Sequence, residues 1–170
     1  IPDILSIEDL TACTQLNWDI NPLSDTAFNP AIPNFKVDDH VIIAGQDTIT
    51  AAPELVRLTG NIAFAHTDAS RSYLKKRLVY GGHTISLAYA QIMRAIPNTI
   101  ALIGWQGCDH LGPVLEEDII RTEFTVANIT PIPAGGSLYE LNIDTYANRL
   151  DQERNYVESK VLNWRLVLWV

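Results

Sequence analysis

One histidine and one glycine pair have the residue types and the spacing for chemistry at a carbonyl-activated carbon. His66 lies in the polar stretch 61–68, just after a glycine, and Gly81-Gly82 begins an apolar helical pattern. An imidazole transfers protons near neutral pH, and the free N–H groups of a helix N-terminus stabilise a developing oxyanion. The order of these segments therefore predicts a proton-transfer group close to an oxyanion-binding helix end.

Two helices and an intervening loop must position these groups. The pattern predicts a short helix over 51–59, with Thr50 as its N-cap and Gly60 at its end. A loop over 61–80 is then expected to carry the histidine. Apolar residues recur at helical spacing over 81–95 and predict a longer helix with one buried face.

The second half of the chain is predicted to form strands. A first strand is expected at 40–44, and the charged stretch 149–160 is expected to be an exposed turn or a small helix. Alternating or β-branched apolar residues predict the remaining strands over 99–108, 118–128, 138–147 and 161–170. One long helix packed on an antiparallel sheet is an α+β fold.

Composition narrows the classes of function. The chain has 170 residues, of which 47% are hydrophobic, and a net charge of −8 without a basic stripe, which argues against nucleic acid as a partner. No apolar run approaches the roughly 20 residues of a membrane span. Cys13 and Cys108 form no metal motif, and few cysteines without a signal-like N-terminus indicate a cytoplasmic protein. The basic cluster Lys75-Lys76-Arg77 is either a solvated loop or a contact for a phosphate-bearing ligand such as coenzyme A.

The first 35 residues differ from the rest of the chain. Residues 1–35 are rich in proline, asparagine and aspartate, with only a weak helical pattern from Ile4 to Leu16. They are predicted to be an N-terminal extension or a linker between repeats, while 36–170 form the domain. The chain begins at Ile1 without a methionine, which favours a processed, trimmed or partial chain.

Across residues 37–170 the sequence resembles the MaoC-like dehydratases, the (R)-specific enoyl-CoA hydratase group with the hotdog fold. That family has Gly-Asp-x-Asn-Pro-x-His-x-Asp where this chain has Gly60-Asn61-Ile62-Ala63-Phe64-Ala65-His66-Thr67-Asp68. His66 and Asp68 match, whereas Asn61 replaces the family's catalytic aspartate. Tyr80-Gly81 corresponds to the family's His-Gly, and the stretch 109–118 is similar to its Arg-Phe-x-x-Pro-Val-x-x-Gly-Asp.

The resemblance implies a hotdog domain in which an antiparallel sheet wraps around one long central helix. It implies a hydro-lyase of fatty acid metabolism that adds water reversibly to a 2-enoyl-CoA, with Asn61, His66 and the oxyanion-binding Gly81 as catalytic residues. Coenzyme A then enters only as part of the acyl-CoA substrate, with no separate cofactor or metal. The implied substrate-binding residues are Asp68, Tyr80, Gly82 and His83.

Several roles stay open at the level of sequence. Asp68 either orients the ring of His66 or caps the following turn, and Tyr80 either lines the site or packs in the core. His83 either caps or packs the helix, or compensates for Asn61 as a second proton-transfer group. His110 is either structural or lines the acyl pocket.

The neutral side chain of Asn61 leaves two functions open, because an amide cannot act as a base at pH 7. In the first, His66 carries the proton transfer while Asn61 orients the water. In the second, the chain is a catalytically degenerate hotdog unit that binds acyl-CoA or completes a dimer. A thioesterase is disfavoured, since residues 84–89 contain no carboxylate.

The resemblance also implies a partner. The variant loop is most similar to the double-hotdog branch, which includes mesaconyl-CoA hydratase-like proteins. We therefore expect a homodimer or pairing with a second hotdog unit, with the active site at the interface, because an unpaired sheet edge is a liability.

Overall fold

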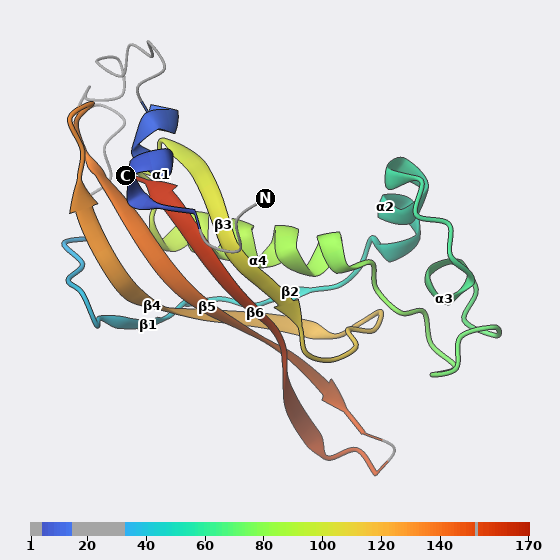
Figure 1. The fold of residues 1–170 in the computed structure, drawn as a ribbon. Helices are drawn as coiled ribbons and strands as arrows, with labels where there is room; N and C mark the ends of the chain where they lie inside the picture. The colour runs from blue at the N-terminus through green and yellow to red at the C-terminus, as the bar shows by residue number, and fades with distance from the viewer. Residues whose placement is uncertain (1–4, 15–32, 152) are drawn as a thin grey trace.

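The computed structural model describes residues 5–14, 33–151 and 153–170. One long helix, α4 (Gly81–Ala95), lies across one face of a strongly curved antiparallel sheet (Figure 1). The sheet has the order β1-β4-β5-β6-β3, with β2 also paired to β4. Its strands are β1 (His40–Ile42), β2 (Asp47–Thr48), β3 (Ala101–His110), β4 (Ile119–Pro131), β5 (Ser137–Leu150) and β6 (Tyr156–Trp169). The predicted α+β architecture, a sheet wrapped around one helix, is confirmed.

The main core lies between α4 and the concave face of the sheet. Ala88, Ile92 and Ile96 recur at helical spacing and are fully buried against the strands. On β4 the predicted alternation is confirmed, because one face is buried from Ile120 to Val126. The residues of that face are Ile120, Thr122, Phe124 and Val126. No helix in the described part of the chain is long and apolar enough to cross a membrane.

The prediction for 149–160 was wrong over most of this stretch, because β5 runs to Leu150 and β6 begins at Tyr156, and the exposed turn is limited to the residues around Asp151 and Arg154. Their ladder continues to the pairing of Leu150 with Tyr156. This end of the hairpin projects beyond the helix (Figure 1), so neither face needs the apolar alternation that marks a half-buried strand. The charged residues of this stretch therefore show no pattern typical of strands, although the strands are regular.

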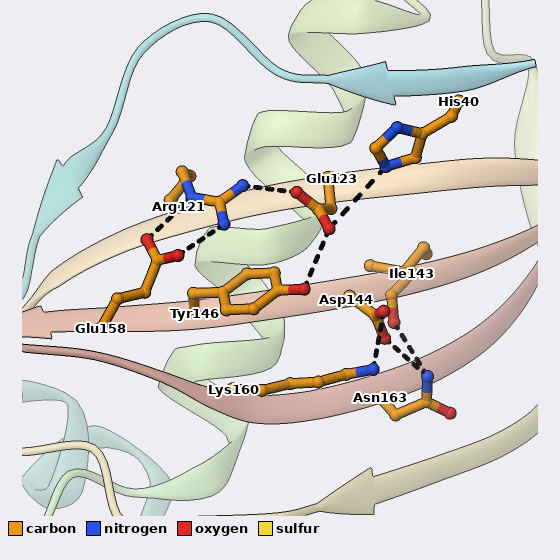
Figure 2. A network of polar contacts seen from close by, with 9 residues as sticks. All are labelled: His40, Arg121, Glu123, Ile143, Asp144, Tyr146, Glu158, Lys160 and Asn163. Carbon is orange, nitrogen blue, oxygen red and sulfur yellow. Dashed lines mark hydrogen bonds and ion pairs between the residues drawn. The ribbon is translucent and has the colours of Figure 1, made fainter.

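Charged side chains on the convex face pair across the strands, as Figure 2 shows. Arg121 donates two hydrogen bonds to Glu158, at 3.0 and 2.9 Å, and a third to Glu123 at 2.5 Å. The hydroxyl of Tyr146 donates to Glu123 at 2.9 Å, and burial together with this carboxylate raises the pKa of Tyr146 to about 12. The Tyr146–Glu123 contact joins neighbouring strands and stabilises their pairing, while Arg121 and Glu158 connect β4 to β6 across β5.

Two short helices precede α4. α2 (Ala52–Thr59) ends at Gly60 as predicted, because Gly60 takes the left-handed conformation at φ 70°. Its N-cap is Ala51 rather than the predicted Thr50, and no side chain among the described residues caps it. α3 (Phe64–Thr67) lies where the sequence predicted only loop. A single turn of helix is too short to produce a periodic pattern.

The described part of the N-terminal stretch packs on the sheet. α1 (Ile7–Thr14) inserts Leu10, which is 1% exposed, against Leu138, Val167 and Trp169. Gly104 makes room for it, since a Cβ atom there would lie 2.9 Å from a methyl carbon of Leu10. Residues 1–4 and 15–32 of the predicted extension or linker lie outside the described residues.

Replacing Leu10 by alanine is expected to lower the free energy of unfolding by about 2 kcal/mol, because it removes a buried side chain and leaves a cavity. Urea unfolding measures the change. Cys13→Ala on the exposed face of the same helix serves as the control. Equal stability of the Leu10 variant and the wild type would show that α1 contributes nothing to the fold.

Candidate functional site

A cavity of about 390 Å³ lies at the head of α4. Its polar wall includes His66 of α3, Gly81 and Thr84 of α4, and His110 at the end of β3. Apolar side chains from residues 78–79 and 111–114 form much of the rest. The volume lies within the range of small-molecule binding sites, and a few polar groups converge on a largely apolar wall.

Main-chain pairing brings the walls of the cavity together. The segment before α4 pairs with the segment after β3, with the N–H of Val79 donating to the carbonyl of Val114 at 2.8 Å. Leu78 and Leu115 form an isolated bridge next to it. The N–H of Leu78 also donates to the carbonyl of Ala65 at 2.9 Å, which fixes α3 beside the cavity.

The main chain also fixes the orientation of the His66 ring. Its Nδ1 atom lies 2.7 Å from the carbonyl oxygen of Leu78. A carbonyl oxygen only accepts, so Nδ1 carries the proton in this hydrogen bond. In the neutral ring Nε2 is then the unprotonated nitrogen, and it is the atom that can accept a proton in the cavity. The ring of Tyr80 lies edge-on to His66, with centroids 6.4 Å apart.

The first two residues of α4 are glycines, so their main-chain N–H donors have no side chain of their own beside them. The N–H of His83 donates to the carbonyl of Tyr80, while no acceptor is found within the described ranges for the N–H of Gly81 or Gly82. The first N–H groups of a helix have no intrahelical partner. A Cβ atom at Gly81 would lie 2.7 Å from Nε2 of His110, and one at Gly82 would lie 2.5 Å from the ring of Tyr80. Both positions therefore favour glycine.

A buried ion pair supports the wall formed by residues 111–114. Asp118 is 2% exposed, and its Oδ2 atom accepts hydrogen bonds from the Leu115 N–H and the Arg149 guanidinium, each at 2.7 Å. Arg149 also donates to the carbonyl of Pro113 at 2.8 Å. Burial raises the pKa of Asp118, although Leu115, Arg149 and Lys76 oppose that shift.

Five of the seven predicted site residues do not line this cavity, namely Asn61, Asp68, Tyr80, Gly82 and His83. Asn61 follows the end of α2 and is half-buried. The carboxylate of Asp68 accepts from the N–H and hydroxyl of Ser70, at 2.9 and 2.7 Å, and these bonds lower the pKa of Asp68. The structure therefore gives Asp68 the turn-capping contact, while Leu78 holds the ring of His66. Nδ1 of His83 is buried and has no hydrogen-bond partner in the part of the chain that the structure describes, and burial lowers the pKa of His83.

The structure brings His66 and Gly81 to one cavity, and Tyr80 and Gly82 lie next to them. It adds His110, which was not among the predicted site residues although pocket lining was one of its open roles. The signal in the sequence was the histidine at position 110, where the family motif has phenylalanine. Within the described ranges, no group of three His, Cys, Asp or Glu residues could hold a metal ion.

The fold and this cavity define a hotdog protein, with an antiparallel sheet around a central helix. Its structural neighbours are double-hotdog proteins and MaoC-like dehydratases. A conserved hypothetical protein of Mycobacterium tuberculosis with a double hotdog fold is 33% identical, with a TM-score of 0.75 over 89% of this chain and 44% of that chain. A MaoC domain protein dehydratase of Chloroflexus aurantiacus is 21% identical, with a TM-score of 0.66 over 97% of this chain and 48% of that chain.

Other comparisons agree with this assignment of the fold. An R-hydratase of Pseudomonas aeruginosa is 16% identical, with a TM-score of 0.60 over 80% of this chain and 82% of that chain. Among curated proteins, the beta-methylmalyl-CoA dehydratase of Chloroflexus aurantiacus is 24% identical over 178 residues. That alignment covers 96% of this chain and 51% of the relative, so the chain spans about half the length of the curated protein it matches. No family model matches the chain.

Proposed function

We propose that this hotdog unit catalyses the reversible addition of water to a 2-enoyl-CoA thioester. The observation that carries the proposal is the His66 ring, whose Nδ1 is tied to the Leu78 carbonyl on the wall of a cavity that also holds the head of α4. That bond leaves Nε2 as the basic nitrogen. The dehydratase among the curated relatives supports the same class of reaction.

The reaction follows from these groups. Nε2 of His66 takes a proton from water as the water oxygen bonds to Cβ of the substrate. The electron pair of the carbon–carbon double bond moves toward the thioester oxygen, where the N–H of Gly81 stabilises the negative charge. The enolate then collapses and Cα takes the proton back from His66. One imidazole thus serves as base and as acid, and no oxidant or cofactor is needed.

The basic cluster supports a thioester carried by coenzyme A. Arg77 is occupied, because it pairs with Glu116 at 2.8 Å and donates to the carbonyl of Thr67. Lys75 and Lys76 form no ion pair within the described part of the chain. They lie between Tyr73 and Leu78, which both line the cavity. In the proposal these two lysines meet phosphates of coenzyme A at the cavity mouth.

Lys75→Glu is expected to raise the Kd for butyryl-CoA about 5-fold, because it replaces an attractive charge at the rim by a repulsive one. Added salt is expected to reduce the difference, as ions screen exposed charges. Isothermal titration calorimetry measures both effects, with exposed Lys36→Glu as the control. An unchanged Kd at low salt would remove Lys75 from the binding site.

A second hotdog unit is part of the proposal. β3 is an edge strand that pairs only with β6 in the described sheet. Its Trp105 is 45% exposed although it packs edge-on against Trp164, with ring centroids 5.1 Å apart. Pairing along this edge, with a second copy or with another hotdog in a longer chain, would cover the open strand. Two relatives about twice as long as this chain support the pairing.

The test of the function is direct. Purified protein is incubated with crotonyl-CoA and with mesaconyl-CoA, and the loss of the enoyl absorbance is followed. Turnover with formation of the 3-hydroxyacyl product supports the hydratase. A folded wild type that turns over neither substrate contradicts it for these acyl groups.

The alternative is a degenerate hotdog unit that binds acyl-CoA or completes a dimer. The observation that favours it is Asn61, whose neutral side chain stands where the related motif has a catalytic carboxylate.

Asn61→Asp separates the two functions. A hydratase is expected to gain about 10-fold in kcat, because a carboxylate can take part in proton transfer and an amide cannot. Activity that is absent in the wild type and created by this substitution favours the degenerate unit. Asn34→Asp on the exposed surface is the control for the added charge. If Asn61→Asp neither raises an existing activity nor creates one, position 61 lies too far from the reacting atoms.

A further inference from the structure

The imidazole of His110 lies directly against the head of α4. Its Nε2 and Cε1 atoms lie 2.7 and 2.8 Å from the position that a Cβ atom of Gly81 would occupy. His110 lines the same cavity as His66. Its side chain is exposed and has no hydrogen-bond partner among the described residues.

Covalent geometry places the two donors within reach of one oxygen atom. Because Cβ and the main-chain nitrogen are bonded to the same Cα, Nε2 of His110 lies within about 5 Å of the nitrogen of Gly81. An acceptor at a normal hydrogen-bond length of about 2.9 Å from each nitrogen fits between donors at that separation. The N–H of Gly81 has no acceptor in the described ranges.

We propose that Nε2–H of His110 and the N–H of Gly81 together hold the thioester oxygen of the substrate. The inference rests on the proposed hydratase function and assigns a second donor to its oxyanion site. His110 keeps its proton throughout: it donates a hydrogen bond to the carbonyl, and the bond strengthens as charge develops on the enolate oxygen. Proton transfer remains with His66.

This assignment also explains the glycine at position 81. Any side chain there would separate the imidazole from the main-chain donor, since the Cβ position is in contact with the ring. Glycine is thus what allows a side chain from β3 and a main-chain group from α4 to meet at one acceptor. The two residues are 29 positions apart in the sequence, so only packing of the helix on the sheet makes the pair.

Two substitutions test the donor. His110→Phe keeps a flat ring and removes the N–H, while His110→Gln keeps an N–H donor that cannot act as an acid. For the hydration of crotonyl-CoA we expect His110→Phe to lower kcat about 100-fold with a small change in KM. His110→Gln is expected to stay within about 10-fold of the wild type. His40→Phe on the convex face is the matched control.

A second measurement does not depend on turnover. Acetoacetyl-CoA is a β-ketoacyl thioester, and its enolate has a near-ultraviolet absorption band. An oxyanion site is expected to increase this band on binding, in the wild type and in His110→Gln but not in His110→Phe. Full activity and a full enolate band in His110→Phe overturn the proposal. A loss of activity in His110→Gln equal to that in His110→Phe also overturns it, because it identifies a proton donor instead.

The two measurements separate the two hypotheses. If wild type lacks hydratase activity yet shows an enolate band that disappears in His110→Phe, the proposed reaction fails and the oxyanion site stands. If the wild type turns over crotonyl-CoA and His110→Phe equals it in both assays, the reaction stands and the oxyanion site fails. A wild type without turnover and without an enolate band overturns both.

Discussion

His66→Ala is expected to lower kcat for the hydration of crotonyl-CoA by about 10²–10⁴-fold, the usual contribution of a positioned general base. The reason is the geometry of the ring, whose Nδ1 is held by the Leu78 carbonyl so that Nε2 is the basic atom. KM is expected to change little, since the ring acts on water rather than on the bulk of the substrate. Steady-state kinetics on both proteins separates kcat from KM.

The control for this substitution is His40→Ala. His40 is exposed on the convex face, where it lies 3.7 Å from Glu123, and it does not line the cavity. His40→Ala shows whether the loss of any imidazole, at a position outside the cavity, lowers kcat. A His66 variant with wild-type kcat would show that another group moves the proton, and melting curves for both variants guard against loss of fold.

Arg149→Leu is expected to lower the free energy of unfolding by about 3–5 kcal/mol at neutral pH, because it leaves the Asp118 carboxylate buried without its cation. Asp118 is 2% exposed and accepts from Arg149 at 2.7 Å. The substitution also removes the hydrogen bond from Arg149 to the Pro113 carbonyl on the cavity wall. Urea unfolding gives the stability, and acyl-CoA titration reports on the wall.

The loss of stability in this variant is expected to depend on pH. Burial already raises the pKa of Asp118, and removing Arg149 raises it further. A carboxyl group with a raised pKa in the folded state favours folding below its unfolded pKa, and that contribution is lost as the pH rises through the folded value. The difference between variant and wild type is therefore expected to be smaller at about pH 4.5 than at about pH 7.5.

Arg57→Leu is the matched control. Arg57 pairs with Glu54 on the exposed surface of α2, and such a pair contributes less than about 1 kcal/mol. A similar loss for both arginine variants would mean that burial of Asp118 has no special cost. A loss for Arg149→Leu that does not change with pH would contradict the role given to the Asp118 charge.

The sequence by itself determined the elements that are half-buried over a long stretch. Alternation on 118–128 assigned the inward face of β4, and helical spacing over 81–95 gave the buried side of α4. Both signals are local, because the side chains of one element repeat toward one core. For the same reason the strands at 149–160 and the single turn of α3 escaped prediction, since neither produces a periodic apolar pattern.

The candidate site was likewise predicted in part from the sequence and decided in part by the tertiary structure. Residue type and motif alone pointed to His66 and Gly81. An imidazole transfers protons wherever it lies, and a glycine at the start of a helix leaves a main-chain N–H free to bind an oxyanion. Tertiary structure decided that the main-chain carbonyl of Leu78 orients His66. The carboxylate of Asp68, which could have had that role, accepts a hydrogen bond from Ser70. The tertiary structure also brought His110 to Gly81, across 29 residues of chain. Such a contact depends on how a helix lies on a sheet, and no local pattern in the sequence encodes that distance.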